Sequence, residues 1–355
     1  MNPQLVAIAG QFSAGQTVTG VKPLGLGLIN DSYRVDTVGG SFVLQRINNQ
    51  VFPQPANIMA NLRQLSRHIA LLPAAAVKLK IPAIILTGER KTCFPDTEQH
   101  YWRALELIAP AESREFISRP EEAAQVGFAL AHFHNLCSRL PTATLHDTLP
   151  GFHITPAYYR QYANLKEQRL PHINSAESRF CRKFIDSFHA RIDVLENAKL
   201  QGRLMERVIH GDPKLNNFLF TPGGNEIVSL IDLDTVKPGL IHYDLGDCLR
   251  SSCHNADNNR FDSDRAEIIL GHYLAEAGQF LTEADYDYLY AAIELLPFEL
   301  GLRFYSDYLA GNRYFKVSDS EQNLRRARDL FELCNDINRQ RPQIEKMLAG
   351  IKSKL

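Results

Sequence analysis

The sequence lacks the features that would mark a membrane, secreted or zinc-binding protein. No apolar run approaches the roughly 20 residues that a membrane-spanning helix needs, and no Lys/Arg-led apolar segment opens the chain. The six cysteines are scattered without the C-x-x-C or Cys/His spacing of disulfide frameworks and zinc sites. We therefore expect free thiols, no membrane partner and a cytoplasmic location.

The chain also lacks an excess of charge of either sign. Its 39 Lys and Arg residues nearly balance 40 Asp and Glu residues, giving a net charge of -1. Nucleic acid is therefore not an expected partner, because no broad positive surface is available. The length of 355 residues and the hydrophobic content of 45% are typical of a globular enzyme with two core-bearing lobes.

The first third of the chain alternates between strand-like and helical patterns. Glycine-punctuated β patterns cover residues 21–47, and a helical pattern follows at 57–72. A second strand pair at 78–86 and 100–108 completes an N-terminal lobe with an antiparallel sheet. Residues 110–120 have the composition of a hinge or short linker.

The rest of the chain is predicted to be mostly helical, apart from two short β-like stretches at 208–220 and 226–233. Helices are predicted at residues 121–140, 264–277, 283–309 and 320–348. The predicted fold class is therefore α+β. A small sheet-containing lobe spans residues 1–109, and a larger helical lobe with the catalytic loop and the acceptor site spans 110–355.

One segment concentrates side chains that suit phosphoryl transfer. It reads HGDPKLNN from residue 210 to residue 217, and IDLD follows at 231–234. Transfer from ATP needs a carboxylate that orients the attacking hydroxyl, and oxygen ligands that hold magnesium on the phosphates. Asp212 and Asn217 can meet these needs from one tight loop, and Asp232 arrives at the end of an apolar strand. The alternative is that these are ordinary turn-forming residues.

The motifs VIHGDPKLNNFLF and SLIDLDT resemble the aminoglycoside phosphotransferase and choline kinase superfamily, whose fold is that of the protein kinases. Four further segments resemble the N-acetylhexosamine 1-kinases: GLINDSYRV, FVLQRINNQVFP, IDLDTVKPGLIHYDLGDCLR and LGLRFYSDYLAGNRYF. The resemblance spreads from residue 25 to residue 315. It implies a bilobal protein-kinase-like fold, ATP and Mg²⁺ as cofactors, and a small-molecule acceptor.

The resemblance also implies roles for the motif residues. Asp212 matches the catalytic base, and Asn217 and Asp232 match the magnesium ligands. Asp234 is a candidate second carboxylate for metal or substrate, or else a solvated residue at a strand end. His210 is expected to buttress the loop by hydrogen bonding.

Asp244, in the segment HYDLGD, resembles the aspartate that pins the catalytic-loop backbone in kinase folds. Its expected role is therefore indirect.

The nucleotide loop is less well specified by the sequence. Gly25 and Gly27 lie in a turn where backbone N–H groups can approach phosphate oxygens. Asn30 and Ser32 could add side-chain donors. A plain hairpin is the alternative.

The strand after this loop departs from the protein-kinase pattern. Protein kinases place there a lysine that contacts the phosphates and pairs with a helix glutamate. Gln45 takes the register of that lysine, and residues 57–72 contain no glutamate. Arg46 is the nearest cation and a candidate phosphate contact, although strand alternation points it to the opposite face.

The predicted contacts with adenine and with the acceptor rest mainly on the resemblance. Leu105 and Leu107 lie in the segment that matches the hinge, which binds adenine through its backbone. Trp102 is assigned to packing rather than to ligand contact. Arg303 matches a sugar-contacting arginine of the N-acetylhexosamine kinases. Leu28 stands where those kinases commonly have a sugar-contacting histidine, which leaves the acceptor open.

Arg303 also has an alternative interpretation as half of a buried ion pair. Glu299 and Asp307 lie at helical spacing from it and could be the partner.

Three functions remain open at this point. The leading one is an ATP- and magnesium-dependent kinase that phosphorylates a sugar hydroxyl, in first place the anomeric hydroxyl of an N-acetylhexosamine. The second is an aminoglycoside or amino-alcohol kinase, for which Glu294, Glu299 and Asp307 could line a cationic pocket. The third is a nucleotide-binding pseudokinase, which the absent lysine and glutamate would fit.

Overall fold

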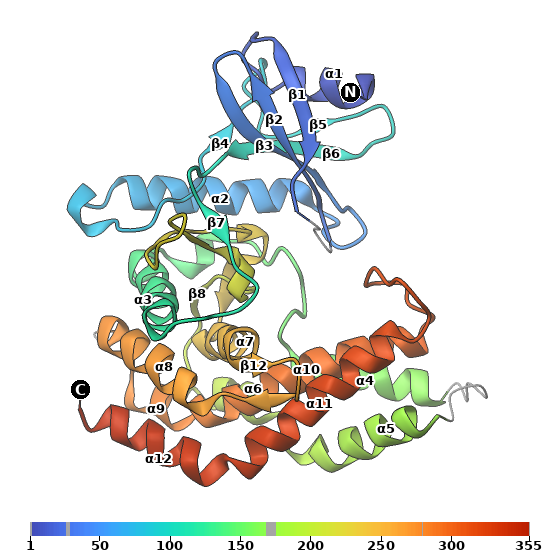
Figure 1. Cartoon of the computed structure of the whole chain (residues 1–355), viewed down its shortest axis with the longest axis vertical. Coiled ribbons are helices and arrows are strands. Elements are labelled where there is room, and N and C mark those ends of the chain that lie inside the picture. The colour runs from blue at the N-terminus through green and yellow to red at the C-terminus, as the bar shows by residue number, and fades with distance from the viewer. Residues whose placement is uncertain (1, 26–28, 168–174, 279, 355) are drawn as a thin grey trace.

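The computed structural model describes residues 2–25, 29–167, 175–278 and 280–354. Its N-terminal part is built on a six-stranded antiparallel sheet with the order β1-β2-β3-β6-β4, in which β5 also pairs with β6. The strands are β1 (Val18–Pro23), β2 (Asp31–Thr37), β3 (Gly40–Ile47), β4 (Ile84–Ile85), β5 (Phe94–Pro95) and β6 (Tyr101–Glu106). Figure 1 shows this sheet above the helical part of the molecule.

The two faces of the sheet differ in chemistry. One face buries Phe42, Leu44 and Trp102 against α1 (Pro3–Gly10) in a core of its own. The indole Nε1 of Trp102 donates to Oδ2 of Asp96 at 2.8 Å, which confirms the predicted packing role. The other face carries Gln45 and Arg103, because the residues that alternate with these apolar ones point the opposite way.

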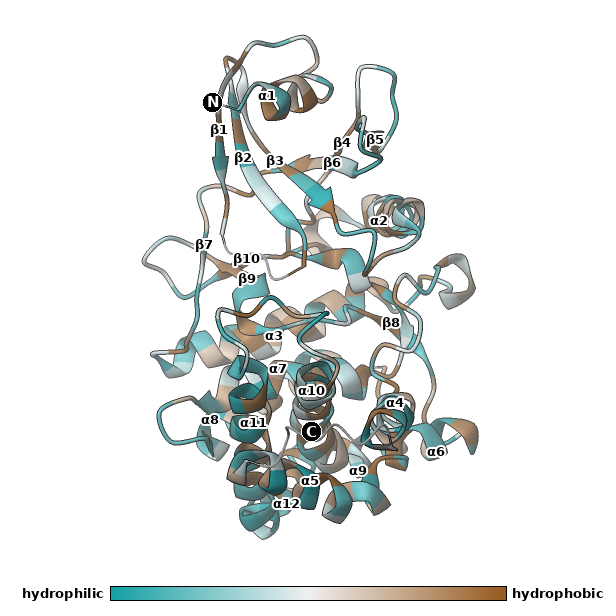
Figure 2. Cartoon of the chain, turned by 90° about the vertical axis from the view of Figure 1, so that its right-hand side faces the viewer, coloured by the Kyte–Doolittle hydropathy of each residue, from teal (hydrophilic) through white to brown (hydrophobic). Residues whose placement is uncertain are grey.

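Helix α2 (Pro55–Ala70) lies between the sheet and the larger lobe (Figures 1 and 2). Ile58, Leu62 and Leu65 recur at helical spacing and are buried in the core of the larger lobe. The helix therefore connects the sheet-bearing segment to the helical core.

The larger lobe is mainly helical. Its helices are α3 (Pro120–Cys137), α4 (Thr155–Glu167), α5 (Ala176–Phe188), α6 (Val194–Leu200), α7 (Ile241–Cys253), α8 (Ser263–Ala277), α9 (Glu283–Asp287), α10 (Leu289–Leu309), α11 (Gln322–Arg339) and α12 (Arg341–Lys352). Most residues of α10 are buried, as expected for a helix at the centre of a bundle. It packs against α4, α7 and α11.

Short paired strands flank the loops of the larger lobe. They are β8 (Arg207–Ile209) with β11 (Lys237–Gly239), β9 (Phe218–Phe220) with β10 (Ile227–Leu230) and with β7 (Glu112–Ser113), and β12 (His254–Asn255) with β13 (Arg260–Phe261). The pairs at β8 and β9 bracket residues 210–217, so the predicted catalytic loop leaves one pair and enters the next.

The predicted α+β architecture is confirmed, with differences at several elements. Helices α1, α4, α5, α6 and α7 and the short strands β5, β12 and β13 were not individually predicted. The predicted helix at 283–309 is interrupted at Tyr288, and the one at 320–348 is interrupted at Gln340, just before Pro342. Within the predicted hinge, β7 pairs with β9, so this segment belongs to the sheet of the larger lobe.

Two expectations from the composition can be compared with the structure. All six cysteines are free, and five of them are buried. None of the helices in the described ranges combines the length and the apolar character that crossing a bilayer requires.

Candidate active site

The backbone of the catalytic loop is held by Asp244 in the first turn of α7. Its two carboxylate oxygens accept hydrogen bonds from the backbone N–H groups of His210 at 2.7 Å and of Gly211 at 2.8 Å. Burial alone would raise the pKa of Asp244, but the hydrogen bonds that it accepts from His134 and from the backbone of His210 outweigh burial and lower the pKa. The predicted pinning role is therefore confirmed, with His134 as a partner that the sequence did not reveal.

His210 links the loop to the strand that precedes Asp232. Its Nδ1 accepts from the backbone N–H of Asp212 at 3.2 Å, and its Nε2 donates to the carbonyl oxygen of Ile231 at 3.0 Å. A neutral imidazole has one acceptor nitrogen and one donor nitrogen, which matches these two contacts. The side chain thus buttresses the loop by hydrogen bonding, as predicted.

Gly211 is required by the path of the loop. Its φ is +88°, and a Cβ added there would lie 2.6 Å from the carbonyl oxygen of Thr235. Thr235 is itself held in place, because its Oγ1 donates to the carbonyl oxygen of His210 at 2.9 Å. Any larger residue at 211 would therefore push the catalytic loop off its neighbour.

The structure brings the three predicted chemical residues together. Nδ2 of Asn217 donates to the backbone oxygen of Asp212 at 2.7 Å. Nζ of Lys214 lies 2.5 Å from Oδ2 of Asp212 and 4.0 Å from Oδ2 of Asp232. Asp232 adopts a left-handed conformation with φ 65°, which turns the chain directly after β10. The carboxylates of Asp212 and Asp232 therefore face one cation.

Lys214 is a further candidate site residue, which was not predicted from the sequence. Burial alone would lower its pKa, but the carboxylates of Asp212 and Asp232 outweigh burial and raise it. Lys214 therefore stays charged at neutral pH. Its position two residues after Asp212, inside the motif, was the available signal.

The donor set fits a magnesium ion that is shared with phosphates. The described residues contain no group of three or more His, Cys, Asp or Glu side chains that could hold a metal ion. Magnesium bound to a nucleotide needs only one or two protein oxygens in addition to the phosphates. The carboxylate of Asp232 and the amide oxygen of Asn217 can supply them.

The nucleotide loop is described only in part, since Gly27 and Leu28 lie outside the described residues. Gly25 has φ +71°. The side chains of Asn30 and Ser32 are already engaged by the protein: Nδ2 of Asn30 donates to Oδ2 of Asp234, and Ser32 accepts from Gln45. Their contacts with phosphate remain predictions.

Arg46 lies on the outer face of the sheet. It stands opposite Trp102 in the strand register and forms an ion pair with Asp31. Strand alternation separates it from the face that carries Gln45. Its position therefore gives no support to the predicted phosphate contact. Asp31 also pairs with Lys316, in the loop between α10 and α11 that rises toward the sheet in Figure 1.

The predicted hinge begins at the end of β6. Leu105 lies in the strand between Val43 and Ile84, and Leu107 follows one residue after the strand ends. Their contacts with adenine remain predictions.

Asp234 is neither solvated nor free for metal. It is 3% exposed, and one carboxylate oxygen lies 2.5 Å from Nη2 of Arg103, which is 1% exposed. The other accepts the hydrogen bond from Asn30 at 2.7 Å. Arg103 has no local signal in the sequence, because its partner lies in the other lobe.

A second buried pair reaches the catalytic loop from α10. Nδ1 of His153 lies 3.0 Å from Oε1 of Glu299, and its Nε2 lies 2.6 Å from the carbonyl oxygen of Gly211. Thr155 donates to the other oxygen of Glu299 at 2.7 Å. Both ring nitrogens of His153 face acceptors, so the ring is an imidazolium.

Arg303 is surrounded by aromatic rings. Its guanidinium carbon lies between 5.0 and 5.8 Å from the ring centroids of Phe152, Tyr158, Tyr314 and Phe315. These distances suit cation–π attraction. We refer to these four rings as the aromatic box.

The alternative of an ion pair between Arg303 and Glu299 or Asp307 is wrong. Glu299 is engaged by His153 and Thr155. Asp307 accepts backbone N–H groups from the loop after α10 and the amide of Asn323. Helical spacing permitted the pair, but both carboxylates have other donors.

The pKa of Arg303 reflects both its burial and its charged and aromatic neighbours. Burial alone would lower the pKa of Arg303, but Tyr158, Tyr314 and two carboxylates outweigh burial and raise it. One of these carboxylates is that of Asp212. Arg303 therefore stays charged within the aromatic box.

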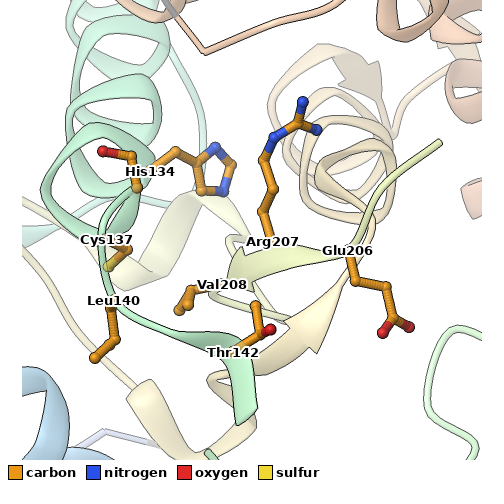
Figure 3. Close-up of a pocket in the computed structure, with 8 residues that line it drawn as sticks. His134, Cys137, Leu140, Thr142, Glu206, Arg207 and Val208 are labelled. Atoms are coloured by element: carbon orange, nitrogen blue, oxygen red, sulfur yellow. The ribbon is translucent and has the colours of Figure 1, made fainter. Parts of the chain in front are cut away.

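A separate cavity of about 220 Å³ lies behind the catalytic loop. Figure 3 shows its lining, including His134 from α3 and Arg207 and Val208 from β8. His134 also donates to Asp244, which holds the loop, and none of the predicted site residues lines the cavity.

The sequence model of a known family matches residues 20–296, which include residues 210–217 and Asp232. It describes the phosphotransferase enzyme family. The chain belongs to this family.

Solved structures agree with the phosphotransferase fold. An aminoglycoside phosphotransferase from Alicyclobacillus acidocaldarius is 18% identical, with a TM-score of 0.66, and the match covers 98% of this chain and 97% of that one. A microcompartment-associated aminopropanol kinase is 17% identical, with a TM-score of 0.66 and coverages of 96% and 98%. An amicoumacin kinase, solved with AMP-PNP, Ca²⁺ and its ligand, is 16% identical, with a TM-score of 0.61 and coverages of 94% and 93%.

Proposed function

We propose that this phosphotransferase is an ATP- and magnesium-dependent kinase that phosphorylates the anomeric hydroxyl of an N-acetylhexosamine. Family membership and the joint position of Asp212, Asn217, Lys214 and Asp232 support phosphoryl transfer. The observation that carries the acceptor assignment is Arg303, whose guanidinium lies in the aromatic box without a carboxylate partner among the described residues.

The protein's own residues would act by positioning and by charge. Asp212 accepts a hydrogen bond from the acceptor hydroxyl and takes its proton as the new bond to phosphorus forms. Lys214 balances the carboxylates in the resting enzyme and can turn its ammonium toward the transferred phosphoryl group. Asn217 and Asp232 would hold magnesium, which neutralises charge on the phosphates when bound.

Arg303 favours an oxygen-rich, uncharged acceptor. Its five N–H donors suit hydroxyl and carbonyl oxygens, such as those of an acetamido sugar. An aromatic box of this kind can also bind a ligand cation, but here the guanidinium of the protein fills it. A cationic acceptor would meet repulsion at this position.

The carboxylates that an amino-alcohol or aminoglycoside acceptor would need are otherwise engaged. Glu294 is paired with Arg191, Glu299 with His153, and Asp307 with the loop after α10. The intact set of Asp212, Asn217 and Asp232 likewise favours an active enzyme over a pseudokinase. The sugar-kinase assignment is therefore the best supported of the three.

An acceptor panel tests this proposal. N-acetylhexosamines, hexoses, aminoglycosides and choline are each incubated with ATP and Mg²⁺, and ADP release is measured. We expect turnover with an N-acetylhexosamine and loss of the reducing end of the sugar, because an anomeric phosphate blocks it. Turnover of choline or an aminoglycoside with no turnover of sugars would contradict the acceptor class.

The matched variants are Asp212→Asn and, as a control, Asp186→Asn. Asp186 forms an exposed ion pair with Lys166 on the surface of the helical lobe. We expect Asp212→Asn to lower kcat by about 100-fold or more, because a positioned base contributes on the order of 10²–10⁴. Undiminished activity of this variant would remove Asp212 from the mechanism.

A further inference from the structure

Two charged positions of a protein-kinase cleft are neutral in this protein. Gln45 takes the place of the strand lysine, and α2 (Pro55–Ala70) contains no acidic residue that could pair with it. In protein kinases this lysine contacts the phosphates and the glutamate holds it in place. The cleft face of the sheet must therefore obtain its positive charge from elsewhere.

Arg103 is the cross-strand neighbour of Gln45. The two residues are paired in the register of β3 and β6, so their side chains share one face of the sheet. Nε of Arg103 donates to Oε1 of Gln45 at 3.0 Å. The guanidinium therefore lies at the tip of side chain 45, where a lysine at that position would bring its ammonium.

Asp234 supplies the carboxylate partner. It lies 2.5 Å from Nη2 of Arg103 and only two residues after Asp232. The same carboxylate accepts from Asn30, at the end of the nucleotide loop, at 2.7 Å. Arg103 thereby joins the sheet, the nucleotide loop and the segment that carries the metal-side carboxylate.

One donor of this arginine remains available. Nη1 of Arg103 has no hydrogen-bond partner among the described residues, although the side chain is 1% exposed. Buried donors in folded proteins are nearly always paired, and an exception needs a reason. An ion pair that only stabilised the fold would not need to leave this donor unused.

Arg46 and Lys214 are also cations of the candidate site, but neither lies beside Gln45 on its face of the sheet. Arg46 lies on the outer face of the sheet, paired with Asp31. Lys214 belongs to the catalytic loop and is paired with Asp212. Unlike these two residues, Arg103 combines the face of the sheet that carries Gln45 with a link to the segment that carries Asp232.

We propose that Arg103 replaces the strand lysine of the protein-kinase cleft. It positions Asp232 through Asp234, and its Nη1 donates to a phosphate oxygen of the bound nucleotide. This inference rests on the proposed function only in that the protein must bind a nucleotide with magnesium; it is independent of which acceptor is used.

Three variants and one control test the assignment. Arg103→Met/Asp234→Asn removes both charges, which avoids leaving a carboxylate buried and unpaired. Arg103→Met/Gln45→Lys keeps Asp234 and moves the cation to β3. Arg103→Met alone removes the cation without removing the Asp234 charge or supplying another cation. Arg34→Met is the control, because Arg34 pairs with Asp36 at 2.8 Å on the surface of the same sheet.

Binding of AMP-PNP with Mg²⁺ is measured by calorimetry, alongside kcat, KM for ATP, the magnesium dependence and the melting temperature. We expect Arg103→Met/Asp234→Asn to weaken binding by about tenfold or more and to need more magnesium for half-maximal activity. Arg103→Met/Gln45→Lys should recover most of this loss. Arg34→Met should match the wild type.

A structural role alone gives a different pattern. If Arg103 only stabilises the fold, the variants melt at lower temperature, yet their folded fraction binds AMP-PNP with wild-type affinity and magnesium dependence. That result overturns the inference, as does a folded Arg103→Met/Gln45→Lys variant with no recovery. A wild-type protein that binds AMP-PNP but phosphorylates no acceptor contradicts the proposed function instead, and the calorimetry still decides the role of Arg103.

Discussion

Nζ of Lys214 lies 2.5 Å from Oδ2 of Asp212. The cation is held by the carboxylate that we assign as the catalytic base, and Asp232 lies within 4.0 Å on its other side. In the absence of substrates, Lys214 thus reduces the repulsion between two carboxylates that must converge on one reaction. We propose that the same ammonium donates to the oxygens of the phosphoryl group when that group enters the site.

We predict that Lys214→Met lowers kcat by about 100-fold, the usual effect of removing one preorganised donor to a developing charge. The KM for ATP should change less, because the lysine acts at the transferred group. Steady-state kinetics measure both. Lys166→Met removes an exposed lysine paired with Asp186 and should behave as wild type. Equal losses in the two variants would argue against a role for Lys214.

Gly211→Ala is expected to disrupt catalysis by displacing the loop. The added Cβ would meet the carbonyl oxygen of Thr235 at 2.6 Å. A shift of about 1 Å in a catalytic group can cost about 100-fold in rate, so we expect a loss of that order in kcat. Gly223→Ala is the matched control, since Gly223 has φ +65° but open space around its Cβ. A normal rate for Gly211→Ala would show that the loop tolerates the contact.

The His153–Glu299 pair predicts a pH dependence of stability. Burial alone would lower the pKa of His153, but Glu299 outweighs it and raises the pKa above its ordinary value near 6.5. A raised pKa means that the folded protein binds the proton more tightly than the unfolded chain. The contribution to stability is therefore complete below about pH 6.5 and is lost as pH rises through the folded pKa.

Urea unfolding between pH 6 and pH 9 tests this sign, with a slope of at most about 1.4 kcal/mol per pH unit from this one group. His153→Gln should be less stable at low pH and should flatten the dependence. His272→Gln, on an exposed part of α8, is the control and should keep the wild-type profile. A wild-type profile in His153→Gln would refute the imidazolium assignment.

Arg303→Met is predicted to raise the KM for the acceptor and to leave the KM for ATP nearly unchanged. A hydrogen bond to a charged group contributes about 1.5–3 kcal/mol, which corresponds to roughly a 10- to 100-fold effect. Arg303→Lys should restore little of the affinity for the acceptor, because an ammonium lacks the planar, forked arrangement of N–H donors of a guanidinium. Arg341→Met removes an arginine that stacks on Tyr290 outside the site and should leave both KM values unchanged. An altered KM for ATP alone would place Arg303 on the nucleotide side.

The sequence predicted the parts of the site that depend on local order. Asp212 and Asn217 belong to one loop, and the apolar run before Asp232 marks the strand that delivers it. Periodicity likewise predicted the helical lobe, because an amphipathic face repeats along the chain. Breaks such as Gln340 escaped prediction because the pattern of buried residues continues across them.

The contacts between distant segments could not be predicted in the same way. Arg103 and Asp234 are 131 positions apart, and the strand pattern does not reveal which buried arginine meets which carboxylate. Helical spacing suggested Glu299 as a partner for Arg303, but His153 holds Glu299 instead. Such choices depend on tertiary packing, which local spacing does not encode.

Glu299 and Arg303 project from α10 one turn apart, separated by about 6 Å along the helix axis. The first residue supports the loop at Gly211 through His153, and the second lies in the aromatic box, where we propose that the acceptor binds. A rigid helix therefore sets the spacing between chemistry and recognition. The rings of the aromatic box come mostly from other segments, so they can be exchanged without moving that helix. We therefore expect that substitutions among these rings can change which acceptor binds, while the spacing between Glu299 and Arg303 on the helix stays the same.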